Sequence, residues 1–207
     1  LVSGMRSRMG FRIHGASGGH AACAATIVDD RNDTVATLEP GRSGLGSLYF
    51  TPENGRNYSA VVREKTGKTS VQALPKIQSA GYVMHLEDKG EKIEVTVNAK
   101  GISQRPVYLF VHARQVIAMA ERKNLDNEAA TFILSRQDLS EGISHFTIFD
   151  ANLQPVCERL YFVYPRKKLG VSLSANQKVF LPRKKVSVTL QTTNSKGTPG
   201  QANLSMA

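Results

Sequence analysis

The sequence predicts an all-β protein made of tandem immunoglobulin- or fibronectin-like antiparallel β-sandwiches, the last of which is truncated. Short segments in which every second residue is apolar recur along the chain, as at residues 93–97. Turn-forming residues separate these segments at intervals of about 8 to 12 residues. A Gly-containing turn followed by a strand and by aromatic residues that end at a Pro also recurs, at residues 44–52 and 142–165. Such repetition is typical of serial sandwiches.

Length and composition indicate a folded chain with more than one core. A sandwich of this class takes about 100 residues, so the 207 residues hold two sandwiches and a remainder. We place them at residues 1–78, 79–165 and 166–207. Hydrophobic residues make up 41% of the chain and charged residues 21%, as in ordinary globular proteins. The sequence has no apolar run of about 18 residues and no signal-peptide pattern. We expect it to be a piece of a larger protein.

Alternation in the first module predicts six strands, at residues 10–14, 21–28, 34–38, 45–50, 57–63 and 69–74. The run DDRND at residues 29–33 predicts the hairpin turn between the second and third strands, because Asp and Asn side chains bond to nearby backbone amides. Pro52 and Gly55 predict a second hairpin, between the fourth and fifth strands, since Pro presets φ and Gly permits a positive φ.

The second module shows the strand pattern more clearly. It has seven strands, the number in a constant-type immunoglobulin sandwich, at residues 82–86, 93–97, 107–111, 115–119, 131–134, 145–149 and 156–164. Residues 135–140 (SRQDLS) predict a single helical turn that Ser135 caps. We expect Leu139 to plug the end of the sandwich.

The third segment predicts three strands, at residues 171–174, 185–192 and 201–207, with turns at Asn176 and at Ser195–Gly197. Three strands with one apolar face cannot bury that face by themselves. We therefore expect the opening half of a third sandwich. Its exposed strands, within residues 169–207, would pack on the neighbouring module, pair with a second copy of the chain, or remain mobile.

The net charge of +10 raises the hypothesis of a polyanion partner. The basic residues cluster at Arg6, Arg8 and Arg12, at Arg166–Lys168 and at Arg183–Lys185. No phosphate-binding glycine loop, aromatic nucleic-acid platform or recognition helix accompanies them. We therefore expect no nucleic acid as partner. A solvated basic face, or contact with acidic envelope lipid or glycan, explains the charge better.

Two sets of residues are of types that bind metals. His14, His20 and Cys23 suit zinc, but they fall at a strand end, in a Gly-rich turn and on the next strand, with no fourth ligand. The aspartates of the DDRND turn suit calcium, although Arg31 lies among them and no second acidic cluster follows. We favour a turn that bonds its own backbone. We thus expect no metal site and no cofactor.

The remaining reactive side chains have simpler structural interpretations. Cys23 and Cys157 lie in different modules, so neither sandwich can form an internal disulfide, and each reads as a small buried residue. His112 and His145 lie on strands among aromatic residues. There we favour half-buried core histidines over pH sensing or catalysis.

Residues 41–46 (GRSGLG) superficially match two catalytic motifs. A nucleophile elbow needs a helix after its serine, whereas a strand follows Ser43, so we predict a hairpin there. A phosphate-binding loop needs a Lys and a helix after its glycines. Here Ser47 stands where the Lys would be. No set of residues passes the geometric tests of an active site, and we expect no enzyme.

Several of these segments resemble macroglobulin-type domains of the α2-macroglobulin superfamily. The resemblance lies in Leu1 with Gly4, in Asp29 with Val35, in residues 44–58 (GLGSLYFTPENGRNY) and in Leu74 with Pro75. Residues 175–207 resemble the start of the following domain, although Phe180 replaces a Tyr, and Arg183 and Lys184 replace Gly and Glu. Similar tandem domains occur in large cell-envelope proteins of the Bacteroidetes, ahead of a TonB-receptor-plug-like region. Covalent protease trapping in this family needs a Cys-Gly-Glu-Gln thioester, which neither cysteine provides.

We therefore expect a non-catalytic, extracytoplasmic spacer and protein-interaction module of a larger envelope protein, in the periplasm or at the outer membrane, with a role in TonB-dependent uptake. Its partners would be other domains of the same polypeptide or an envelope protein, and this segment would not insert into a membrane. Two alternatives remain open. One is a protease-engaging macroglobulin whose thioester lies outside this chain. The other is an adhesin or glycan-binding module, which a basic groove lined by aromatic residues would favour; the candidates are Tyr108, Phe110, Tyr161, Phe162 and Tyr164.

Overall fold

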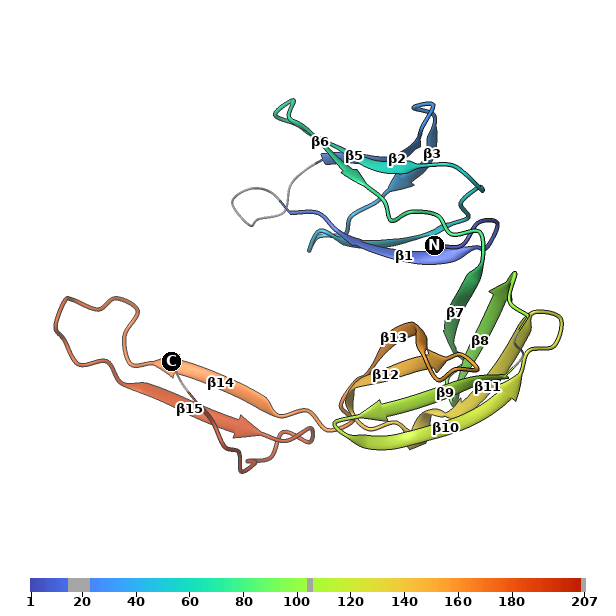
Figure 1. Cartoon of the computed structure of the whole chain (residues 1–207). Coiled ribbons are helices and arrows are strands. Elements are labelled where there is room, and N and C mark those ends of the chain that lie inside the picture. Colours follow the sequence, from blue (N-terminus) through green and yellow to red (C-terminus); the bar gives the residue numbers. More distant parts are fainter. Residues whose placement is uncertain (15–22, 104–105, 206–207) are drawn as a thin grey trace.

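The computed structural model describes residues 1–14, 23–103 and 106–205, and it confirms an all-β, antiparallel fold (Figure 1). Two sandwiches follow one another, and a hairpin extends beyond the second. No helix in these residues is long and apolar enough to cross a bilayer.

The first sandwich packs a two-stranded sheet on a four-stranded sheet. The two-stranded sheet contains β1 (Ser7–Arg12) and β4 (Leu45–Phe50). The four-stranded sheet contains, in order, β3 (Thr34–Leu38), β2 (Cys23–Asp29), β5 (Tyr58–Glu64) and β6 (Thr69–Ala73). Ala25, Ile27, Leu38, Phe50 and Tyr58 form the core between the two sheets. Phe50 and Tyr58 meet edge to face across it, with ring centroids 4.8 Å apart.

The DDRND turn joins β2 to β3 as predicted, but the second predicted hairpin, between residues 45–50 and 57–63, is wrong. β4 pairs with β1, and β5 pairs with β2 and β6. The physical reason is that Pro52 is buried, and the backbone N–H of Glu53 donates to the Tyr58 hydroxyl (2.9 Å). These contacts carry the chain across the sandwich from one sheet to the other.

The turn around Ser43 is likewise not a hairpin between paired strands. The Gly41 N–H donates to the Leu45 carbonyl (2.8 Å), which closes a tight turn, and β4 follows as expected. The strands on either side of this turn, β3 and β4, belong to different sheets. Gly44 has a φ of +75°, and a Cβ there would lie 2.0 Å from the carbonyl oxygen of Ile13, so only glycine fits.

The second sandwich has all seven predicted strands. Its three-stranded sheet contains β11 (Ala129–Ser135), β8 (Lys92–Lys100) and β7 (Gly81–Asp88); its four-stranded sheet contains β10 (Val116–Asn124), β9 (Pro106–Ala113), β12 (Gly142–Phe149) and β13 (Pro155–Val163). Alternate residues of these strands point inward and are fully buried, among them Val95, Val111, Phe132 and Phe146. Burying one such side chain contributes about 1.5–3 kcal/mol to stability.

The fourth strand of this sandwich lies next to the third, whereas a constant-type sandwich places its fourth strand on the opposite sheet. The turn explains the difference. Arg114 and Gln115 both have positive φ (47° and 67°), and Ala113 pairs with Val116. This is a two-residue turn of type I′, which joins adjacent antiparallel strands and cannot cross to the other sheet.

The predicted helical turn is confirmed as a 3₁₀ turn, η1 (Arg136–Asp138). The Ser135 hydroxyl accepts a hydrogen bond from the backbone N–H of Gln137 (3.3 Å), as an N-cap does. Leu139 is buried in the core of the second sandwich, as predicted.

The third segment forms a hairpin of β14 (Gly170–Ala175) and β15 (Val188–Thr193). A third strand at 201–207 is not found: residues 201–205 are not a strand, and residues 206–207 lie outside the described part. After β15, the described residues form only an isolated bridge between Thr193 and Pro199, and Gly200 forms hydrogen bonds with Thr192. Pro199 has no N–H to donate to a longer ladder. Leu173 and Leu190 pair across the hairpin and are exposed, so its apolar face does not pack on the second sandwich.

Removing residues 169–207 should leave the two sandwiches folded, because the described hairpin shares no core cluster with either of them. We expect cooperative thermal unfolding followed by circular dichroism, with a midpoint within about 3 °C of the full chain. Loss of the cooperative transition would show that the boundary near Pro165 is wrong.

Candidate functional site

The first four residues join the two sandwiches. Ser3 is buried; its backbone N–H donates to the Gln78 carbonyl (2.9 Å), and Val2 forms a parallel bridge with Gln78. The ammonium group of Lys100, at the end of β8, donates to the carbonyl (2.6 Å) and hydroxyl (3.1 Å) oxygens of Ser3. Contacts from both modules therefore hold the junction in one arrangement.

This junction places β1 on the side of the first sandwich that faces the second (Figure 1). A cleft of about 560 Å³ lies between β1 and β4 above and β7 and β13 below. Its lining includes Arg6, Arg8, Tyr49, Arg159 and Tyr161. Pockets of this size commonly hold small ligands.

Uncharged groups hold the three guanidinium groups of the cleft. Arg6 lies over the ring of Tyr49, 3.9 Å from its centroid, in a cation–π contact. Arg8 donates from Nε and Nη2 to the Ser47 hydroxyl (3.3 and 3.1 Å). Arg159 donates from Nη2 to the backbone carbonyl of Arg8 (3.1 Å), which adds a further contact across the junction.

The carboxylates that line the cleft pair with other groups. The Asp88 carboxylate accepts hydrogen bonds from the Tyr161 hydroxyl and from the backbone N–H of Gly90, and it pairs with Arg136 (3.4 Å). The Tyr161 hydrogen bond and the Gly90 amide lower the pKa of Asp88 below its ordinary value. Glu87 pairs with Lys89 (2.8 Å). The positive charge of the cleft is therefore not neutralised from within.

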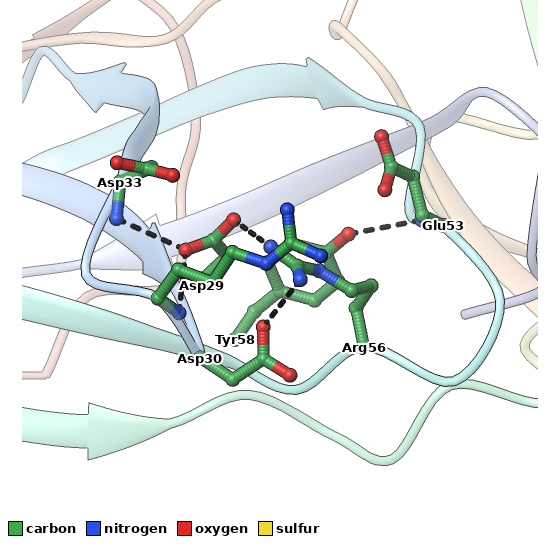
Figure 2. A network of polar contacts seen from close by, with 7 residues as sticks. Asp29, Asp30, Asp33, Glu53, Arg56 and Tyr58 are labelled. Atoms are coloured by element: carbon green, nitrogen blue, oxygen red, sulfur yellow. Dashed lines mark hydrogen bonds and ion pairs between the residues drawn. The ribbon is translucent and has the colours of Figure 1, made fainter.

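The aspartates that suggested calcium form a different structure, shown in Figure 2. One Asp29 carboxylate oxygen accepts hydrogen bonds from the backbone N–H groups of Arg31 (2.9 Å) and Asp33 (3.0 Å), which confirms a turn that bonds its own backbone. The other oxygen pairs with the Arg56 guanidinium, which also pairs with Asp30 (3.0 Å). The positive charge between these two aspartates is thus an arginine of the chain itself.

The zinc candidates are only partly described. His20 lies outside the described residues, His14 follows β1, and Cys23 begins β2. Across residues 1–14, 23–103 and 106–205, no group of three or more His, Cys, Asp or Glu side chains is placed to hold a metal ion.

Both cysteines have free thiols and are half-buried. The Cys157 Sγ donates to the Tyr82 carbonyl (3.5 Å) and packs against the core of the second sandwich. Burial raises the pKa of the Cys157 thiol to about 11, so it is protonated at neutral pH. A protonated thiol is a poor nucleophile and a poor metal ligand.

The two strand histidines are half-buried, as predicted, but they do not lie in the core. His112 and His145 stack on the outer face of the four-stranded sheet, with ring centroids 5.0 Å apart. The Nδ1 atom of His145 lies 2.8 Å from a Glu158 carboxylate oxygen. Their inward neighbours, such as Ser144 and Phe146, point to the core, and alternation therefore turns the histidines outward.

Large apolar side chains surround this histidine pair. The strand register places Ile117, Ile143, Leu160 and Phe162 on the same face, and their exposed fractions are 60%, 51%, 60% and 47%. We call these four residues the outer apolar face. Sequence reasoning missed it, because an apolar residue at every second position predicts a strand without saying which face is buried. The signal was the run of apolar residues at consecutive positions 160–163 (LYFV).

The five aromatic residues named as candidates for a groove lie in different places. Tyr161 lines the cleft and also packs against the core, 6.3 Å from the Phe146 ring. Phe162 and Tyr164 meet edge to face where the chain leaves β13. Tyr108 and Phe110 lie on the outer side of β9. The structure adds Tyr49 from the first module to the aromatic residues that line the cleft.

Two of the known proteins that are similar to this chain match it only in part. No known protein-family profile matches the chain. The tRNA modification GTPase MnmE of Lactobacillus gasseri is 28% identical over 159 residues, which are 70% of this chain and 34% of that protein. A solved structure of E. coli alpha-2-macroglobulin in its native conformation is similar with a TM-score of 0.31 and 11% identity, over 94% of this chain and 14% of that chain. This chain thus spans a minor part of either protein.

The Asp29 network predicts an acid-sensitive first sandwich. Burial by itself raises the pKa of Asp29, but the hydrogen bonds from Asp33, Arg31 and Arg56 outweigh it and hold this pKa below its ordinary value of 3.8. Because the folded pKa is lowered, the ionised carboxylate stabilises the fold above the ordinary value, and this contribution is lost as the pH falls through the folded pKa.

We therefore expect Asp29→Asn to lower the urea-unfolding midpoint of the first sandwich at pH 7 and to weaken its dependence on pH below about 4. Amide NMR signals of β2 report this transition. Glu39→Gln, at an exposed position of the same module, is the control and should change neither property. If the urea-unfolding midpoint fell with pH in the same way in Asp29→Asn and in the unaltered chain, that result would contradict this role of Asp29.

Proposed function

We propose that this chain is a non-catalytic spacer and protein-interaction module in the extracytoplasmic part of a larger cell-envelope protein. The junction at Ser3 carries the proposal. Interfaces between domains of one chain usually permit relative motion unless specific contacts prevent it. Here Lys100 and Arg159 donate hydrogen bonds across the junction to backbone carbonyls of the first module. Beside the junction, Gln78 accepts a hydrogen bond from Ser3. A stiff pair of sandwiches can hold a distal domain at a fixed distance.

The outer apolar face supports the interaction part of the proposal. Contiguous exposed apolar surface on a soluble protein commonly marks a contact with another protein. Ile143 and Phe162 pair directly across β12 and β13, so the surface is continuous there. The partner would be another domain of the same polypeptide or an envelope protein. A second copy that binds through the exposed strands of residues 169–207 is a further expectation.

The absence of catalysis is also part of the proposal. Ser43 is followed by a strand and has no helix to present it, and burial keeps the Cys157 thiol protonated. We do not carry GTPase activity over to this chain. The glycines at residues 41–46 are followed by Ser47 within β4, where a phosphate-binding loop requires a Lys and a helix.

The envelope location and the role beside TonB-dependent uptake come from the motif resemblance to bacterial macroglobulin-type domains. The same resemblance allows a protease-engaging protein with its thioester elsewhere. The sequence of the complete protein separates the two: a TonB-plug-like region supports the uptake role, and a Cys-Gly-Glu-Gln motif supports the protease role.

A substitution at Lys100 tests the stiff junction. Lys100→Met removes two hydrogen bonds to Ser3 and leaves the cores of both sandwiches intact. We expect ¹⁵N relaxation to give the two sandwiches one common tumbling time in the unaltered chain and two shorter, distinct times in the variant. Lys92→Met, at the exposed start of the same strand, is the matched control. Independent tumbling in the unaltered chain would contradict the spacer role.

A further inference from the structure

We propose that the cleft between the two sandwiches binds an acidic sugar, meaning a sugar ring that carries a carboxylate or phosphate group. This role goes beyond spacing, because it gives the junction a ligand of its own. The charge, the hydrogen-bonding capacity and the lining of the cleft each point to this chemistry.

The charge of the cleft favours an anion. Among residues 1–14, 23–103 and 106–205, no carboxylate pairs with Arg6, Arg8 or Arg159. The two acids that line the cleft pair with cations outside its lining, Asp88 with Arg136 and Glu87 with Lys89. Three guanidinium groups thus line one cleft with excess positive charge. Carboxylate and phosphate are the groups that guanidinium binds best, through two parallel hydrogen bonds.

The arginines keep donors for a ligand while uncharged groups hold them in place. A guanidinium has five N–H donors. Arg8 uses Nε and Nη2 on the Ser47 hydroxyl, and Arg159 uses Nη2 on a backbone carbonyl. Arg6 is positioned by the Tyr49 ring and makes no hydrogen bond among the described side chains. Positioning by neutral groups leaves the charge available and lowers the entropy cost of binding.

The rest of the lining suits a sugar ring better than a bare anion. Tyr49, Leu86 and Leu160 place aromatic and aliphatic surface beside the arginines. Such surface contacts the C–H faces of a ring, whereas polar groups at the rim bond its hydroxyls. The volume of about 560 Å³ exceeds what a single phosphate or sulfate ion needs. An inorganic anion would leave the apolar part of the cleft without a contact.

The cleft exists only when the modules are joined. Arg6, Arg8 and Tyr49 come from the first sandwich, and Leu86, Arg159 and Tyr161 come from the second. A ligand that bridges them would strengthen the junction, because any molecule that binds only the joined state stabilises it. The affinity for the ligand and the stiffness of the junction should therefore change together.

Titration calorimetry on the full chain tests the proposal with four probes: a digalacturonate, a sugar phosphate, a neutral disaccharide and inorganic phosphate. We expect measurable affinity for one or both acidic sugars, with affinity falling as salt concentration rises. We expect binding at least tenfold weaker, or none, for the neutral disaccharide and for inorganic phosphate. Comparison of the two acidic sugars identifies carboxylate or phosphate as the group that is bound.

Three variants locate the site. Arg159→Gln and Arg6→Gln should each weaken binding of the acidic sugar by about tenfold to a hundredfold, the effect of losing one charged hydrogen-bonding partner. Among the described residues Arg6 has no hydrogen-bond partner across the junction, so Arg6→Gln separates ligand binding from module coupling. Arg63→Gln removes the same charge from an exposed position on β5, outside the cleft, and should leave affinity unchanged.

Any one of four results with these probes and variants would overturn the proposal. They are failure of both acidic sugars to bind, equal binding of the neutral disaccharide, equal binding of inorganic phosphate, and an equal loss of affinity in Arg6→Gln and Arg63→Gln. A Glu-rich peptide that competed with equal affinity would assign the cleft to an acidic protein segment and would likewise exclude the sugar. Unchanged melting of each variant confirms that a loss of binding is not a loss of folding.

Discussion

The structure depends on the two-residue period of its strands. In β8, Ile93, Val95 and Val97 point inward and are fully buried, whereas Glu94 and Thr96 lie on the other face. The facing sheet supplies Val111 and Phe146 in the same way. A one-residue slip in register would move every buried side chain to the solvent face, so the alternation fixes the register and the pairing of the two sheets together. The cleft and the outer apolar face both occupy positions that this register defines.

The junction between the two small sandwiches creates the cleft that neither sandwich has by itself. Each sandwich fills its own interior with side chains, which leaves no room for a ligand there. The space between modules is different, because the surfaces that meet at Ser3 and Lys100 are polar and do not close on each other. Arginine is common at such positions, since its planar group bonds backbone carbonyls and aromatic rings while it remains charged. A spacer of this kind can therefore gain a binding site without altering either core.

Local patterns predicted the elements well, and pairing across the chain less well. Ser135 and Leu139 were identified correctly because a cap and a plug depend on neighbours a few residues away. The predicted hairpin after Phe50 was wrong because turn residues do not reveal which strand lies alongside; the buried Pro52 sends the chain to the other sheet. The cleft was missed for the same reason. Arg6 and Arg159 are far apart in sequence, and only the junction brings them together.

Native-state amide hydrogen exchange tests most directly whether alternation builds two separate dry cores. The account predicts the slowest exchange at β8, β9 and β12 of the second sandwich and at β2 and β5 of the first, because these strands carry buried residues and have paired neighbours on both sides. It predicts fast exchange at β6 and β14, because every residue of these two strands is exposed. It predicts the same for β15, which pairs with β14. Equal protection of the hairpin and the central strands, or fast exchange at β8 and β12, would contradict it.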